Sequence, residues 1–225
     1  METPEKPPDW DAVMAALEAW RRAVNAHDPS VSAVAERYRK DPWAVLASTV
    51  LSLRTKDAVT LAASASLLAA APSPAALVKL SQDAVARLIY PAGFYRTKAS
   101  NLLKIAGLLM AEYQGAVPGT MEALLALPGV GRKTANLVLI EAFDADGICV
   151  DTHVHRISNR TGWVSSKTPE ETEHALRETL PRSYWKGINA LLVLYGQRVC
   201  QPLSPWCSRC PIYAHCARRL LKRSR

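Results

Sequence analysis

The chain has 225 residues, enough to bury a substantial hydrophobic core as one large domain or two small ones. Lysine and arginine outnumber aspartate and glutamate by 28 to 20, so the formal charge is +8 and a polyanionic partner such as nucleic acid is favoured. No stretch is apolar over the length needed to span a membrane, which argues against an integral membrane protein. Because many basic proteins bind no nucleic acid, the charge needs support from a motif.

Helical periodicity runs through nearly the whole chain. Alanine and leucine dominate the apolar positions and runs of β-branched residues are rare, so we predict an all-α protein without strands. A first helix is predicted over residues 11–24. Asp, Ser and Pro at helix-start positions then predict further helices beginning at Pro42, Asp57, Pro74 and Ser81.

Two helices show different apolar patterns. Residues 45–53 are predicted to form a buried helix. Residues 97–113 place Leu102, Ile105, Leu108 and Leu109 at helical spacing, which predicts a one-sided core face with Lys98 and Lys104 pointing away from it. A further core helix is predicted over residues 183–199. The first eight residues and residues 222–225 are expected to be disordered.

The segment 121–143 carries the first motif. A short helix over residues 121–126 meets the turn Leu127-Pro128-Gly129-Val130-Gly131, and a second helix begins at Arg132. The glycines allow a tight turn and a close backbone approach, and the amides that open the second helix can bind a phosphate. We interpret the segment as a helix-hairpin-helix that grips DNA without reading its sequence. The alternative is a plain glycine-containing turn.

Four cysteines near the end of the chain form the second motif, with six, two and five residues between successive members: Cys200, Cys207, Cys210 and Cys216. Four thiolates at this spacing fit either a [4Fe-4S] cluster or a structural zinc ion. Zinc sites usually show two close pairs, whereas only one pair is close here, so we favour the cluster. Disulfides are disfavoured because no signal peptide opens the chain, which indicates a reducing cytosol.

The fifth cysteine, Cys149, lies in an apolar run and is interpreted as a buried thiol. Asp151 follows the same run and opens a helix over residues 152–160, so it is a plausible N-cap. His153 and His155 lie on different faces of that helix, and neither makes a metal site alone.

These motifs together resemble the endonuclease III family of DNA glycosylases. The resemblance rests on residues 127–135, on Val150-Asp151-Thr152-His153 and on the four cysteines, and it covers roughly residues 40 to 217. Residues 51–57 and 88–94 look most like the branch that includes the eukaryotic nuclear and mitochondrial enzymes. The resemblance implies two helical lobes, a six-helix lobe over 35–145 and a cluster lobe made of 1–34 plus 146–225, with DNA across the cleft between them.

The resemblance also implies removal of oxidised pyrimidines from duplex DNA, followed by strand nicking at the abasic site. Lys133 is the implied nucleophile and Asp151 the carboxylate that stabilises the cationic sugar and helps to deprotonate the amine. An attacking amine must be neutral, whereas an ordinary lysine is almost wholly protonated near neutral pH. The start of a helix and the neighbouring Arg132 both disfavour a second cation, so the position suits a nucleophile. A lysine that only contacts phosphate is the alternative.

A flipped nucleotide leaves a gap that the protein must fill. Arg54 stands where the family usually has glutamine, and Phe94 stands where leucine is frequent. Both are predicted wedges, although an arginine donates hydrogen bonds and cannot accept them, which changes the expected preference for the opposite base. A core aromatic and a solvated arginine are the alternatives. Further DNA contacts are assigned to the following residues: Tyr95, Leu127, Gly129, Val130, Gly131 and His153.

Three functions remain open on this evidence. The first is a bifunctional glycosylase and AP lyase, a cytoplasmic, nucleoid-associated monomer that carries a [4Fe-4S] cluster and binds double-stranded DNA. The second is an adenine-mismatch glycosylase, disfavoured because such enzymes usually lack this lysine and carry a further C-terminal domain. The third is a non-catalytic binder of lesions or abasic sites.

Overall fold

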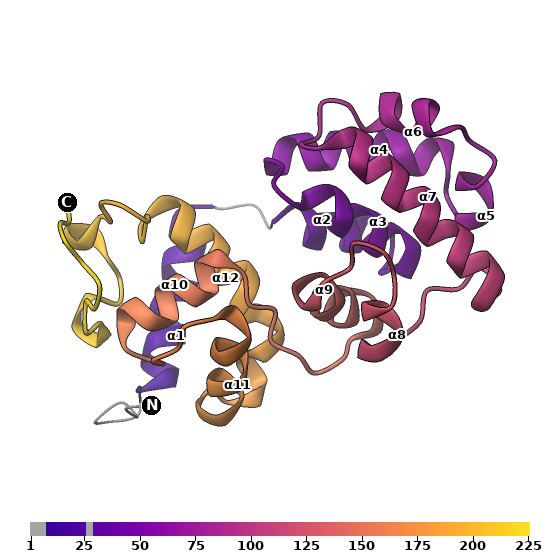
Figure 1. Cartoon of the computed structure of the whole chain (residues 1–225). Coiled ribbons are helices and arrows are strands. Elements are labelled where there is room, and N and C mark those ends of the chain that lie inside the picture. Colours follow the sequence, from indigo (N-terminus) through magenta and orange to yellow (C-terminus); the bar gives the residue numbers. More distant parts are fainter. Residues whose placement is uncertain (1–7, 26–28) are drawn as a thin grey trace. The chain divides into compact units, whose positions relative to one another are not determined.

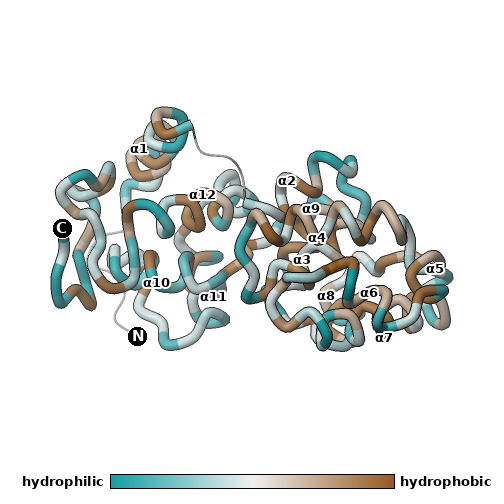
Figure 2. Tube along the Cα trace, turned by 90° about the horizontal axis from the view of Figure 1, so that it is seen from above, coloured by the Kyte–Doolittle hydropathy of each residue, from teal (hydrophilic) through white to brown (hydrophobic). Residues whose placement is uncertain are grey.

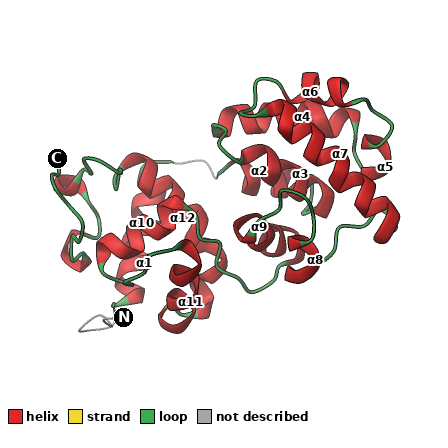
Figure 3. Cartoon of the chain, viewed as in Figure 1, coloured by secondary structure: helices red, strands yellow, loops and turns green. Residues whose placement is uncertain are grey.

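The structure, a computed structural model, describes residues 8–25 and 29–225. Within these ranges every regular element is a helix and there is no strand, which confirms the predicted fold class (Figures 1 and 3). The chain forms two compact units, one made of residues 1–28 with 146–225 and the other of residues 29–145. In the described part of the chain, no helix is long and apolar enough to cross a membrane.

The discontinuous unit joins the first helix to the last three. It contains α1 (Trp10–Ala23), α10 (Thr152–Thr161), α11 (Pro169–Thr179) and α12 (Trp185–Arg198), together with three 3₁₀ turns, η1 (Arg182–Tyr184), η2 (Cys207–Arg209) and η3 (Tyr213–His215). Helix α12 packs against both α1 and α10. Trp20 of α1 meets Tyr195 of α12 edge to face at 5.5 Å, so aromatic contacts fasten the start of the chain to its cysteine-bearing end.

The continuous unit contains eight helices: α2 (Ser30–Arg37), α3 (Pro42–Ser52), α4 (Asp57–Ala70), α5 (Pro74–Leu77), α6 (Gln82–Ile89), α7 (Tyr95–Glu112), α8 (Met121–Leu125) and α9 (Arg132–Phe143). Helix α3 is buried from Trp43 to Leu51 and packs against α2, α4 and α9. Figure 2 shows that hydrophobic positions recur along the helices of this unit. A helix that is apolar on all sides is expected at the centre of a bundle.

The predicted helix starts are confirmed at several caps. Pro42, Asp57 and Pro74 are first residues of helices, and Ser81 is the N-cap of α6. Helix α1 begins one residue earlier than expected because Asp9 caps it through the amide of Ala12. Helices α2 and α11 were not predicted. Cys149 is fully buried, as expected.

Two expectations are wrong. Lys98 does not point away from the core: it is only 5% exposed. The last residues are ordered against the cysteine loop, where the amide of Arg225 donates to Pro205 O at 2.8 Å and its guanidinium lies 4.1 Å from the Trp206 ring. Of the first eight residues, which we expected to be disordered, residues 1–7 lie outside the described part.

Candidate functional site

The hairpin joins α8 to α9 through a turn in which only one glycine is conformationally required. Gly129 has φ +77°, in the left-handed region, and a Cβ there would lie 2.7 Å from Nδ2 of Asn101. Gly131 has φ −97°, which any residue adopts, and a Cβ there would meet nothing within 4 Å. Gly129 therefore shapes the turn, and Gly131 keeps the space in front of α9 open.

The other hairpin residues contribute through their backbone. The side chains of Leu127 and Val130 are buried, at 3% and 6% exposure, and the amide of Val130 donates to Leu127 O at 3.1 Å. Gly131 is the N-cap of α9 and has no side chain with which to cap it. The amides of a first helical turn lack intrahelical acceptors, so this helix end suits an anion.

Lys133 is the second residue of α9 and is half-buried, directly after Arg132. It stands at the positive end of the helix dipole, next in sequence to a guanidinium.

Asp151 is the N-cap of α10, as the sequence predicted. Its Oδ1 accepts hydrogen bonds from the amides of His153 at 2.8 Å and Val154 at 2.9 Å. Both bonds go to one oxygen, so capping occupies half of the carboxylate and fixes its orientation. Lys133 and Asp151 belong to different compact units, and each is positioned within its own unit.

Arg54 and Phe94 lie at the tips of two adjacent loops of the 29–145 unit. Both have positive φ, 53° and 57°, and both are exposed, Phe94 to 61%. The Arg54 guanidinium lies 5.6 Å from the centre of the Phe94 ring. Tyr95 follows as the first residue of α7 and meets Tyr90 edge to face at 5.3 Å. The structure thus brings the two predicted wedges together on one surface.

The four cysteines surround a single pocket in the discontinuous unit, lined also by Tyr195, Trp206 and Arg160. Burial raises the pKa of the Cys210 and Cys216 thiols. At Cys210 a hydrogen bond with the Tyr195 hydroxyl, 2.8 Å from Sγ, acts in the opposite direction and lowers the pKa. Among the described residues, no group of three or more Cys, His, Asp or Glu side chains could hold a single metal ion. The four thiols nevertheless line one pocket, as the ligands of a thiolate-bound metal group would.

Helix α10 links Asp151 to this cysteine site through two arginines that sequence analysis missed. Arg160, 5% exposed, donates to Cys200 Sγ at 3.3 Å and to the carbonyls of Gln201 and Pro202, each at 2.8 Å. Arg156 donates to Cys200 O at 2.9 Å. Their i, i+4 spacing along α10 was the available signal, since it places two cations on one face of a helix that precedes four thiolates.

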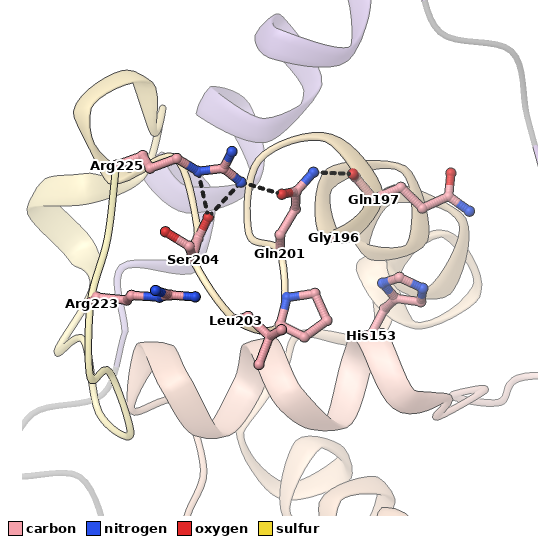
Figure 4. Close-up of a pocket in the computed structure, with 9 residues that line it drawn as sticks. His153, Gly196, Gln197, Gln201, Leu203, Ser204, Arg223 and Arg225 are labelled. Carbon is pink, nitrogen blue, oxygen red and sulfur yellow. Dashed lines mark hydrogen bonds between the residues drawn. The ribbon is translucent and has the colours of Figure 1, made fainter.

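His153 lines a cavity of about 710 Å³ beside the loop between Cys200 and Cys207. Figure 4 shows the guanidinium of Arg223 directed toward this cavity, and Arg225 donating to Gln201 and Ser204 at its rim. The loop itself carries no cation. Positive charge near His153 comes from Arg156, whose Nη2 lies 3.2 Å from His153 Nδ1, and from Arg223 and Arg225 at the cavity.

Comparison with known proteins agrees with this fold and these motifs. Residues 47–182 match the model for the HhH-GPD superfamily of base excision DNA repair proteins. A solved structure of a trapped endonuclease III–DNA covalent intermediate superimposes with a TM-score of 0.77 at 28% identity, over 92% of this chain and 95% of that one. The all-helical fold and the hairpin therefore define a base-excision-repair protein of the helix-hairpin-helix class.

Curated relatives narrow the class. Endonuclease III of Thermotoga maritima is 48% identical over 78% of this chain and 83% of its own length, and that of Escherichia coli is 37% identical over 78% and 83%. The chloroplastic endonuclease III homolog 2 of Arabidopsis thaliana is 43% identical over 93% of this chain but only 58% of its own length. The chain belongs to the endonuclease III family. It is a bifunctional DNA glycosylase and AP lyase that removes oxidised pyrimidines, the first of the three functions considered from the sequence.

Proposed function

We propose that this reaction runs through Lys133 as nucleophile and Asp151 as its carboxylate partner. The neutral amine attacks C1′ of the damaged nucleotide, the bond from C1′ to the base breaks, and the base leaves. Asp151 stabilises the positive charge that develops on the sugar and accepts a proton from the amine. The observation that carries the assignment is a lysine in the first turn of the helix that a glycine hairpin opens.

Strand cleavage follows from the same covalent bond. The amine and the opened sugar form a Schiff base, which makes the C2′ proton acidic. Loss of that proton breaks the bond between C3′ and the 3′ phosphate oxygen, and water later releases the lysine. The strand is cut by elimination, so the cleavage step consumes no water.

We propose that the substrate is double-stranded DNA containing an oxidised pyrimidine or an abasic site. The first turn of α9 binds a backbone phosphate, with Gly131 allowing its close approach, and Leu127, Gly129 and Val130 set the shape of the hairpin. His153 and the surrounding arginines contact a second stretch of backbone. Contacts of this kind position the protein without reading sequence, as a lesion-search enzyme requires.

The gap left by the flipped nucleotide is filled by Arg54 and Phe94, with Tyr95 beside them. Their exposure and their proximity support this role, since an aromatic ring stacks between bases and a guanidinium donates to the orphaned base. An arginine here favours orphaned bases that present acceptors.

We propose that Cys200, Cys207, Cys210 and Cys216 hold a [4Fe-4S] cluster. When bound, the cluster supplies a four-point covalent crosslink that orders the end of the chain. Arg160 and Arg156 then fix the cysteine segment to α10 and so to Asp151 and His153.

Borohydride trapping tests the assignment. The wild-type protein and Lys133→Gln are incubated with a labelled duplex that contains one thymine glycol, with Lys104→Gln as a matched control on an exposed lysine. The wild type and Lys104→Gln are expected to nick the strand and to form a trapped band, and Lys133→Gln to bind DNA without either product. A trapped band of wild-type intensity from Lys133→Gln would disprove the role of Lys133.

A further inference from the structure

Lys98 is a buried cation that the reaction described above does not use. It lies in the first turn of α7, four residues after Phe94, and is 5% exposed. Its Nζ donates to the carbonyl oxygens of Leu51 at 2.7 Å and Leu53 at 2.6 Å, and to Oγ1 of Thr55 at 2.7 Å. An ammonium group has three donors, and each of them finds one acceptor here.

These three acceptors belong to the end of α3 and to the loop that carries Arg54. A helix C-terminus leaves its last carbonyl groups without intrahelical donors. Lys98 supplies donors there from another helix, through hydrogen bonds that its charge strengthens. Burial lowers the pKa of Lys98 to about 8, so the ammonium form still predominates near neutral pH.

The same cluster reaches the loop that carries Phe94. The amide of Gly93 donates to Oγ1 of Thr55 at 3.1 Å, so the Thr55 hydroxyl joins Lys98 to both loops. A side chain at Gly93 would collide with the carbonyl oxygen of Arg54, which shows that the two backbones touch at this point. We call residues 53–56 the Arg54 loop and residues 90–94 the Phe94 loop.

Each loop holds its exposed residue in an uncommon conformation. Arg54 and Phe94 both have positive φ, which residues with a side chain adopt uncommonly and at some cost in energy. Both loops contact one cluster of hydrogen-bonding groups, made of Lys98, Thr55 and the Gly93 amide.

We infer that Lys98, acting through Thr55, is a positioning residue that holds the Arg54 loop and the Phe94 loop in register, so that their tips enter the DNA gap as one unit. The inference rests on the proposed function of Arg54 and Phe94 as wedges. It assigns Lys98 no contact with DNA. Its effect is confined to the step in which a base pair is opened and the gap is filled.

Two substrates separate this role from a general loss of structure. The first is a duplex with one thymine glycol and a neighbouring 2-aminopurine, whose fluorescence reports unstacking. The second is a single-stranded oligonucleotide with a preformed abasic site, in which no base pair has to be opened. Lys98→Met and Thr55→Ala remove the two parts of the cluster. Thr55→Ser keeps the hydroxyl, and Lys104→Met makes the same change as Lys98→Met at an exposed position of α7.

Lys98→Met and Thr55→Ala are expected to lower kcat/KM for excision from the duplex at least tenfold and to reduce the 2-aminopurine signal. Cleavage of the single-stranded abasic substrate should stay within about threefold of wild type. Thr55→Ser and Lys104→Met should remain within about threefold on both substrates. Equal losses on the two substrates would show a purely structural role, and wild-type excision by Lys98→Met would show that the loops do not depend on it; either result overturns the inference.

The double variant Arg54→Ala/Phe94→Ala distinguishes failure of this inference from failure of the proposed wedges. If the double variant excises thymine glycol and unstacks 2-aminopurine as the wild type does, the wedge assignment is wrong and the inference fails with it. If the double variant is impaired and Lys98→Met is not, only the positioning role of Lys98 is refuted.

Discussion

Substitution by alanine should affect different properties at the two glycines of the hairpin, stability at Gly129 and DNA binding at Gly131. Gly129→Ala places a Cβ on a residue with φ +77° and 2.7 Å from Nδ2 of Asn101. The left-handed conformation costs an alanine about 1–2 kcal/mol. Alanine also lowers the conformational entropy of the unfolded chain, which stabilises the folded protein by about 0.4–1 kcal/mol. Because the Asn101 amide must also move, we expect a net loss of about 1–2 kcal/mol in the free energy of unfolding.

Gly131→Ala adds a methyl group to a residue with φ −97° and open space around it. The gain from the unfolded chain is offset by the poorer capping of alanine at an N-cap, so the free energy of unfolding should stay within about 0.5 kcal/mol of wild type. The methyl group nevertheless stands where the proposed phosphate approaches α9. We expect Gly131→Ala to weaken binding to an abasic-site duplex at least fivefold.

Urea denaturation and fluorescence anisotropy with a labelled duplex measure the two effects on the same preparations. We expect a stability defect for Gly129→Ala, and a binding defect without a stability defect for Gly131→Ala. A Gly129→Ala protein as stable as the wild type, or a Gly131→Ala protein that binds DNA as the wild type does, would refute these roles.

Three further changes test other parts of the account. Asp151→Asn keeps a good N-cap, so its free energy of unfolding should stay within about 0.5 kcal/mol of wild type. It should excise thymine glycol at least a hundredfold more slowly in single-turnover assays. A wild-type rate would show that Asp151 takes no part in the reaction. The wild-type protein should contain iron and sulfide in the ratio of a [4Fe-4S] cluster and Cys210→Ser much less of both, whereas stoichiometric zinc in elemental analysis of the wild type would contradict the cluster. Burial lowers the pKa of Lys98 from 10.5 to about 8, so between these values the unfolded chain holds a proton that the folded chain has released, and stability rises with pH. From about pH 7.5 to about pH 9.5, the free energy of unfolding of the wild type should therefore rise by about 2 kcal/mol relative to that of Lys98→Met. Urea titrations of the two proteins at several pH values measure this difference. No change in the difference with pH would show that Lys98 is solvated.

The sequence predicted the features that depend on local chemistry. Helix starts at Pro42, Asp57 and Ser81, the cap at Asp151 and the hairpin turn all follow from side chains within a few residues of each other. Helix α2 lacks a start signal of that kind, because Pro29 precedes it without a side-chain cap. Helix α11 does carry one that the prediction overlooked: the Thr168 hydroxyl accepts from the amide of Glu171, and Pro169 is the first residue of the helix.

Contacts between distant segments could not be predicted in the same way. Lys98 was expected to be exposed because it is charged, although its spacing of four residues from Leu102 and seven from Ile105 places it on the buried face of α7. The carbonyl oxygens of Leu51 and Leu53, about 45 residues away in the sequence, accept hydrogen bonds from Lys98 and so offset the cost of burying its charge. No local pattern reveals such acceptors.

Mass spectrometry of the borohydride-trapped complex tests the central claim most directly. After reduction on an abasic-site duplex, digestion of the DNA and proteolysis, the peptide that carries the reduced sugar is sequenced. We expect one modified residue, Lys133. A sugar remnant on another lysine or on the chain's amino terminus, with Lys133 unmodified, would contradict it.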